Sequence, residues 1–298
     1  VKVILPDPEP PRLIIPPFRG PGARLSFPGP FVDPVGLTRV LKGAGVSRRQ
    51  GSPMFRARVR MEVLRELVGV VSTLVPEVKI VISPEGLEAK AVDPSHVAML
   101  VVRLKKEAFE EFNGEPTEIG LDLEKVREVL QLARPGDILE INYDAPKSRL
   151  VVSVGKLSRS MSVVDPQGMS DPKVPSVNPT AKVSLRIEDL RQGIRGSESI
   201  SDHVTLSLDP EGFALHSEGE NDRVDLRLPK DSLLNLETSE PTRSMYPLDF
   251  FSNMVKSIVT AETVNLALGN QYPLKLDFTL ASGNGDGEFL LAPRVEED

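Results

Sequence analysis

The chain has 298 residues, 40% of them hydrophobic, and a formal net charge of −7. It has no cysteine, which excludes a disulfide framework, a zinc–thiolate site and a cysteine nucleophile. Residues 1–53 contain eight Lys/Arg and three Asp/Glu, so the acidic body that follows is not expected to capture nucleic acid with its whole surface. No apolar run is long enough to span a membrane and no signal-peptide pattern opens the chain, so we expect a soluble cytoplasmic protein without a membrane partner.

The first 53 residues are rich in proline, with 11 of the 27 prolines of the chain. Proline at this density removes backbone donors and blocks both helices and central strands. The first methionine is Met54, and regular periodicity begins immediately after it. We therefore expect residues 1–53 to be a disordered extension, or upstream sequence joined to the protein by a misplaced start. The alternative is a proline-rich ligand for a partner, but no repeated PxxP register supports it.

The body from Met54 onward contains an internal duplication. The stretch "SPEGLEAKAVDPSHVAMLVVRL" at 83–104 is echoed by "DPEGFALHSEGENDRVDLRLP" at 209–229. In both copies alternating strands flank a PEG turn, in which proline presets the first turn position and glycine supplies a positive φ. The duplication therefore predicts the same β-hairpin twice.

Two amphipathic helices accompany each hairpin. Apolar stripes of helical period predict them at 61–74, 122–133, 185–196 and 248–259, and the first has Glu62, Arg65 and Glu66 on its polar face. Further alternating strands follow the second helix of each half. The pattern predicts an α+β fold of two similar domains, each with antiparallel sheets and two helices, at 54–163 and 181–298. A proline-containing connector joins them at 164–180.

Several segments carry a family resemblance. "MFRARV" at the start of the body, "AVDPSHVAMLVVRL" in the first half, "PTAKV" after the connector and "FLLAPRVEED" at the end resemble PCNA sliding clamps of the archaeal type. The resemblance spans 54–298 and implies a duplicated DNA-clamp fold that assembles as a homotrimer, a ring that encircles double-stranded DNA without reading its sequence. A subunit of a heterotrimeric or checkpoint-like clamp is the alternative.

The resemblance also implies a role. A clamp of this kind is a processivity factor in DNA replication, associated with the nucleoid. It performs no chemistry, needs no cofactor, and tethers DNA polymerase, the clamp loader, flap endonuclease and ligase through short peptides.

Asp93, Ser95 and His96 lie within four residues of one another and allow three interpretations. A hydrolase triad is the first, although residues this close in sequence rarely converge and no G-x-S-x-G elbow is present. A histidine that only satisfies local hydrogen bonds is the second. The resemblance implies a third, in which this turn forms part of a pocket for partner peptides. The docking residues are then Val92, His96, Val97, Met99, Val174, Pro175, Val177, Pro273, Leu290, Ala292 and Pro293.

Two more surfaces follow from the resemblance. The DNA-facing candidates are basic residues on the helices, whose acidic neighbours leave a mildly positive lining: Arg65, Lys125, Arg127, Arg191, Arg195 and Lys256. Subunits would pair the strand at 158–164 with the strand at 221–228 through Arg159, Met161, Val163, Val224 and Leu226. Arg159 is expected to form an ion pair with Glu188 or Asp189 across this interface. The scattered histidines have no metal-ligand spacing, so no metal site is expected.

Overall fold

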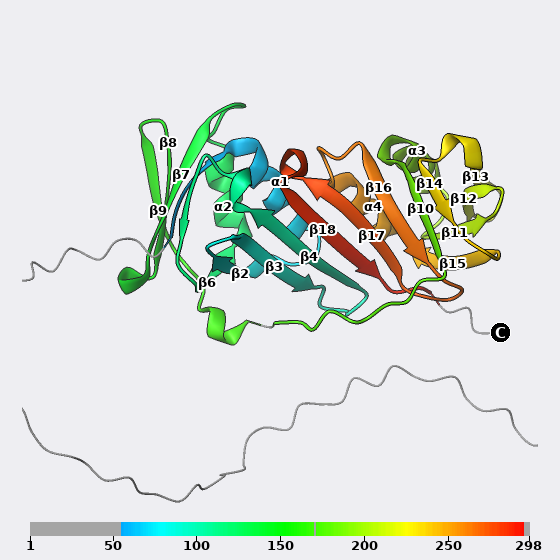
Figure 1. Ribbon diagram of the computed structural model, residues 1–298, viewed down its shortest axis with the longest axis horizontal. Helices are drawn as coiled ribbons and strands as arrows, with labels where there is room; N and C mark the ends of the chain where they lie inside the picture. The colour runs from blue at the N-terminus through cyan, green and yellow to red at the C-terminus, as the bar shows by residue number, and fades with distance from the viewer. Residues whose placement is uncertain (1–54, 170, 295–298) are drawn as a thin grey trace, which may run out of the picture. The chain divides into compact units, whose positions relative to one another are not determined.

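The computed structural model describes residues 55–169 and 171–294 (Figure 1), so the expectation for residues 1–53 falls outside the described part. The first repeat contains β1 (Phe55–Arg60), α1 (Met61–Val71), β2 (Glu77–Ser83), β3 (Gly86–Val92), β4 (Ala98–Lys105), β5 (Glu111–Gly114), β6 (Thr117–Asp122), α2 (Leu123–Leu130), β7 (Ile138–Asp144), β8 (Arg149–Val154) and β9 (Leu157–Ser162). The second repeat contains β10 (Ala181–Arg186), α3 (Ile187–Ser197), β11 (His203–Asp209), β12 (Gly212–Glu218), β13 (Arg223–Pro229), β14 (Asn235–Glu237), β15 (Thr242–Pro247), α4 (Leu248–Ser257), β16 (Thr263–Leu268), β17 (Leu274–Leu280) and β18 (Gly285–Leu291).

Within the described residues the strands form three antiparallel sheets. The order β5-β1-β7-β8-β9 belongs to the first repeat and β13-β12-β11-β15 to the second. The third sheet, β14-β10-β16-β17-β18-β4-β3-β2-β6, is shared, because β18 pairs with β4 from Gly285 opposite Leu104 to Leu291 opposite Ala98. Backbone hydrogen bonds therefore run without a break from one repeat into the other (Figure 1).

The helices form one row behind the shared sheet (Figure 1). Each begins directly where a strand ends, and packing contacts link α2 to α1, α1 to α4 and α4 to α3. On α1 the predicted stripe of Leu64, Leu67, Val68 and Val71 is buried in the core. The helices predicted from apolar periodicity are thus confirmed, and so is the duplicated α+β class.

The repeated PEG turn requires glycine in both copies. Gly86 and Gly212 have φ values of +146° and +157°, which L side chains rarely adopt. A Cβ atom would lie 2.0 Å from the carbonyl oxygen of Leu104 at the first position and 2.2 Å from that of Leu228 at the second. The hairpins β2–β3 and β11–β12 are therefore held by the same steric constraint, as the duplication predicts.

Glu66 corrects an expectation from the sequence. It was expected on the polar face of the first helix, but it is only 4% exposed. Its carboxylate accepts hydrogen bonds from the backbone N–H and hydroxyl of Thr260, at 3.0 and 2.6 Å, and from the backbone N–H of Ala281 at 3.1 Å. A buried charge is tolerated when donors of this kind surround it, and here the donors come from the other repeat.

Candidate functional site

A small apolar cluster lies on the outer face of the shared sheet, opposite the helices. Met99, Val101 and Leu290 are buried there, and Val92 and Val177 pack against them. The register explains the grouping, because Met99 is opposite both Val92 on β3 and Leu290 on β18. Val177 belongs to the connector, which therefore crosses this face and covers the cluster. We call these five residues the outer-face cluster.

The turn before β4 is organised by Asp93, which is buried. Its carboxylate accepts hydrogen bonds from the backbone N–H groups of Ser95 (2.8 Å), Val97 (2.7 Å) and Ala98 (2.6 Å), and from the hydroxyl of Ser95. Burial alone would raise the pKa of Asp93, but the hydrogen bonds from Ser95, Ala98 and Val97 outweigh it and lower the pKa. The carboxylate and hydroxyl of the supposed triad are thus used to shape the turn, which argues against the hydrolase interpretation.

The same turn presents His96 to solvent. His96 adopts φ of +58° and its side chain is exposed. The backbone N–H of Ala292 donates to the carbonyl of Val97 at 2.8 Å, so the residues after β18 lie against this turn. The left-handed conformation of a non-glycine residue indicates that the turn is over-determined by its contacts.

The structure brings together only part of the expected docking set. Val92, Met99, Val177 and Leu290 meet in the outer-face cluster, whereas Val97 packs against the main core and its carbonyl accepts a hydrogen bond from Ala292. The remaining candidates lie on the connector and next to two strands. Val174 and Pro175 are exposed on the connector, and Pro273 and Pro293 are half-buried just before β17 and just after β18.

Two residues of this region were not anticipated. Val101 is buried in the outer-face cluster. Its spacing of two from Met99 on a strand was a usable signal, because alternate residues share a face. Tyr272 accepts a hydrogen bond from the backbone N–H of Asn178 at 2.9 Å and anchors the connector. Nothing in the local sequence pattern indicates that contact.

The basic candidates on the helices are mostly paired with acids. The described helices carry six basic and seven acidic residues. The ion pairs are Lys125–Asp122 (2.8 Å), Arg127–Glu124 (3.5 Å), Arg191–Glu188 (3.4 Å), Arg195–Glu188 (2.8 Å) and Lys256–Glu198. With Glu66 turned into the core, six basic and six acidic residues remain on the surfaces of the four helices.

Two arginines occupy matching places in the repeats. Arg65 on α1 donates to the backbone carbonyl of Leu130 at the end of α2, at 3.3 Å. Arg191 on α3 donates in the same way to the carbonyl of Ile258 at the end of α4. A cation at a helix C-terminus satisfies free carbonyls and opposes the negative end of the helix dipole, so both arginines also hold the helix pairs together.

The strands expected at the subunit contact are sheet edges. In the described part of the chain, β9 ends one sheet and β13 ends another, each with one side unpaired. Met161 is buried, Val163 is half-buried, and Val224 and Leu226 of β13 lie against α3. A Cβ on Gly193 of that helix would come within 2.9 Å of Leu226, so the glycine lets this edge strand pack closely.

The expected ion pair of Arg159 with Glu188 or Asp189 has internal competitors. Arg159 donates to Glu128 on α2 of its own chain. Asp189 accepts from Arg186 at 3.0 Å, and Glu188 is held by two arginines of its own helix. An ion pair of Arg159 with Glu188 or Asp189 of another subunit would require both residues to leave their partners within the chain.

Neither a metal site nor a membrane span is found in the described residues. No group of three or more His, Asp or Glu side chains there is arranged to hold a metal ion. None of the helices in the same part of the chain combines the length and the apolar character of a membrane span.

Comparisons with known proteins agree with this architecture. The family model for the proliferating cell nuclear antigen, N-terminal domain, matches residues 54–162. DNA polymerase sliding clamps of Methanosarcina barkeri and Picrophilus torridus are 36% and 37% identical over 246 residues, covering 82% of this chain and 100% of each relative. A solved complex of the C-terminal region of FEN-1 bound to A. fulgidus PCNA contains a chain 28% identical, with a TM-score of 0.78, over 82% of this chain and 100% of that one. The duplicated fold and these relatives together show that the chain belongs to the DNA polymerase sliding clamp family.

Proposed function

We propose that the chain closes with two further copies into a ring around duplex DNA and serves there as a docking platform for replication enzymes. Its domains in this proposal are 54–163 and 181–298, joined by the connector at 164–180. One observation supports the ring: the edge strands β9 and β13 are the counterparts of β18 and β4, which pair with each other inside the chain.

The two repeats are built from the same pair of half-sheets. The order β14-β10-β16-β17-β18 in the second repeat corresponds to β5-β1-β7-β8-β9 in the first. The order β4-β3-β2-β6 in the first corresponds to β13-β12-β11-β15 in the second. Within the chain, β18 has β4 as its partner, whereas their counterparts β9 and β13 have none among the described strands. Pairing β9 of one subunit with β13 of the next repeats the internal joint and removes both edges.

The internal joint also supplies a register for this contact. Aligning the repeats strand by strand makes Arg223 the counterpart of Met99 and Ser160 the counterpart of Leu290. Because Leu290 faces Met99 within the chain, Ser160 is expected to face Arg223 of the neighbouring subunit. The same register brings Leu157, which is 46% exposed in the single chain, opposite Leu226. Apolar contact and strand pairing then dominate, since exposed ion pairs contribute less than about 1 kcal/mol each.

Engineered cysteines test the register directly, since the chain has none of its own. The double variant Ser160→Cys with Arg223→Cys is expected to form disulfide-linked multimers on mild oxidation. Residues directly opposite on antiparallel strands have Cα atoms about 4.5–5.5 Å apart, within the range that a disulfide bridges, whereas the diagonal pair is about 7–8 Å apart. The matched control, Ser160→Cys with Asp225→Cys, should therefore link poorly. Equal linking of the two variants would contradict the register.

Light scattering on the unmodified chain tests the assembly itself. A particle of three times the chain mass supports the homotrimer. A monomer that assembles only after addition of a related clamp subunit would support the heterotrimeric or checkpoint-like alternative.

We infer that the outer-face cluster, with His96 at its rim and the connector as its movable edge, receives peptides from DNA polymerase, the clamp loader, flap endonuclease and ligase. The related complex named above contains a C-terminal region of FEN-1 bound to a PCNA. An apolar patch bordered by an extended segment suits an aromatic or aliphatic plug. The protein performs no chemistry in this proposal and works in the cytoplasm, on the nucleoid.

Peptide titration tests the docking surface. A synthetic peptide from the FEN-1 C-terminal region is the probe, and Met99→Ala is expected to weaken its binding at least about tenfold, the effect of removing a buried anchor. His96→Ala, at the rim, should have a smaller effect. The control Leu234→Ala removes an apolar side chain that is 61% exposed on another part of the chain and should leave binding unchanged. Equal binding by Met99→Ala and the control would contradict the docking assignment.

We propose that Arg65, Lys125, Arg127, Arg191, Arg195 and Lys256 line the hole of the ring and meet the DNA backbone. Acidic partners on or beside the helices make this contact weak, which suits sliding. Binding of a short duplex should depend only shallowly on salt, because few phosphates are neutralised.

A further inference from the structure

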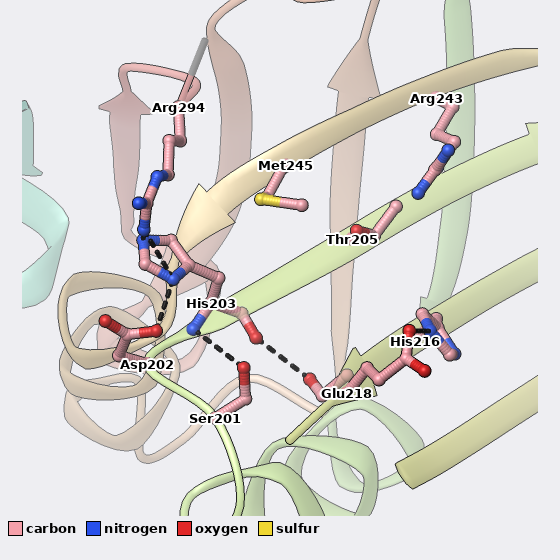
Figure 2. Close-up of a pocket in the computed structure, with 10 residues that line it drawn as sticks. Ser201, Asp202, His203, Thr205, His216, Glu218, Arg243, Met245 and Arg294 are labelled. Atoms are coloured by element: carbon pink, nitrogen blue, oxygen red, sulfur yellow. Dashed lines mark hydrogen bonds and ion pairs between the residues drawn. The ribbon is translucent and has the colours of Figure 1, made fainter. Parts of the chain in front are cut away.

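The outer face of the sheet β13-β12-β11-β15 carries two adjoining depressions of about 780 and 620 Å³. Figure 2 shows the larger one, where the guanidinium group of Arg294 lies against the ring of His203 and Arg243 lies near Thr205. Both depressions include Thr205, His216 and Arg243. This face is turned away from the helices, because Phe213, Leu215 and Leu206 occupy the other side of the strands in the core.

A row of four residues crosses the smaller depression. Arg227 is opposite Ala214, Ala214 is opposite Ser207, and Ser207 is opposite Arg243. The row therefore consists of two small side chains between two arginines. Adjacent strands lie about 4.8 Å apart, so the two arginine Cα atoms are about 14 Å apart.

Several acidic groups of this face already have partners within it. Asp225 lies 2.9 Å from His216 and 3.2 Å from Arg223, and Asp202 is paired with His203. Asp209 accepts hydrogen bonds from its own turn, and Glu211 lies beside it at the end of the depression. Arg227 and Arg243, in contrast, form no ion pair within the described part of the chain. Two cations thus flank a shallow polar floor.

In the corresponding row of the first repeat the arginine is paired with an acid of the same row. That row reads Arg103, Glu88, Val81 and Glu118, by the same strand pairings. Arg103 donates to Glu88 at 2.7 Å. In the second repeat Ala214 stands in the place of Glu88, and Arg243 in the place of Glu118. These two differences leave the row itself with two arginines and no acidic side chain.

The first repeat also shows what can cover such a face. The connector crosses it as an extended segment, with Met169 beside Gly120 and Asp171 in an ion pair of 3.5 Å with Lys90. The counterpart of Gly120 in the second repeat is Met245, which forms an isolated β-bridge with Arg294. No described segment continues from Arg294 across the face.

We propose that the row Arg227–Ala214–Ser207–Arg243 binds an extended acidic segment of a partner protein. The segment lies across the strands, as the connector does on the first repeat, and presents carboxylates to both arginines. An extended chain advances about 3.3 Å per residue, so acidic residues four positions apart span about 13 Å and match the arginine spacing. Small residues of the segment lie between them, over Ala214 and Ser207. This site is separate from the outer-face cluster and gives the clamp a second, electrostatic contact with a bound enzyme.

Fluorescence anisotropy with two labelled decapeptides tests the proposal on the full chain at low salt. One peptide has two glutamates four positions apart in a Gly/Ser background, and the other has them adjacent. The first is expected to bind more tightly. Arg243→Glu and Arg227→Glu should each weaken it at least about fivefold, since each removes an ion pair and adds a repulsion. Arg56→Glu, on an exposed position of β1 without an ion pair in the described residues, is the matched control and should have no effect.

Four outcomes would overturn the proposal. Equal binding of the two peptides, or equal loss in Arg56→Glu, would mean unspecific attraction. Tighter binding of a single-stranded oligonucleotide that is also lost in Arg243→Glu would indicate nucleic acid as the occupant. A gain in peptide affinity on changing Glu296, Glu297 and Asp298 to Gln, Gln and Asn would show that the end of this chain itself occupies the row. An unchanged particle mass in the arginine variants excludes misfolding as the cause.

Discussion

Glu66 offers the sharpest test of how the two halves of the clamp are held together. Its carboxylate receives three hydrogen bonds from Thr260 and Ala281, both in the second repeat. Glu66→Ala removes the acceptor and leaves the buried N–H of Ala281 without a partner, which costs about 1–3 kcal/mol. The two bonds from Thr260, which is partly exposed to water, add about 0.5–1.5 kcal/mol each. We expect the free energy of unfolding to fall by about 3–4 kcal/mol in total.

Urea unfolding followed by circular dichroism, at one protein concentration, measures this loss. Glu66→Gln keeps one acceptor oxygen and is expected to lose about half as much free energy as Glu66→Ala. Glu62→Ala is the matched control, because Glu62 is exposed on the same helix and accepts from the N–H of Gly136 within its own repeat. It should cost less than about 1 kcal/mol. If the two alanine variants unfold at the same urea concentration, Glu66 does not link the repeats as argued.

The remaining predictions concern the docking turn, the repeated hairpin and the N-terminal extension. The pKa of Asp93 is lowered in the folded state, so its stabilisation is complete above the unfolded pKa of about 3.9 and is lost as the pH falls through the folded pKa. The free energy of unfolding of Asp93→Asn should therefore differ most from that of the unmodified protein near pH 7. A difference that persists unchanged at pH 2 would refute this. Gly212→Ala should lower the free energy of unfolding by about 3 kcal/mol, because its Cβ clashes with the backbone of Leu228. Gly136 has a positive φ but open space around it, so Gly136→Ala should lower that free energy by only about 1 kcal/mol. Equal urea midpoints would disprove the steric argument. Deleting residues 1–53 should leave trimer formation and stimulation of a polymerase unchanged, and loss of the trimer in light scattering would contradict the expectation that this segment does not pack.

The local elements could be predicted from the sequence because their signals are local. The helical stripes and the PEG turns depend on residues within one or two turns of each other, and both appear at the expected places. The burial of Glu66 could not be predicted in this way. On α1 alone it belongs with Glu62 and Arg65, and only a second repeat that supplies three donors makes its burial favourable.

The same distinction holds for the site. Met99 and Val92 were identified through the resemblance, and the alternation along β4 would have added Val101. Charge pairing on the helices was only partly accessible. Lys125 and Asp122 are three residues apart and could be paired from the sequence, whereas Lys256 meets Glu198 from a distant part of the chain. The burial of Glu66, which the sequence does not reveal, removes one negative charge from the surface of the helices.

The joint between β4 and β18 has a consequence for how the protein is made. Arg103 and Asp286, which face each other across it, are 183 residues apart. At about 5–20 residues per second, a ribosome needs about 10–40 s to deliver β18 after β4 has emerged. During that interval β4, an almost entirely apolar strand, has an unpaired edge that can recruit strands from other nascent chains. Translation speed and chaperone capture of the first half are therefore expected to influence the yield of the clamp more than the final stability of its core does.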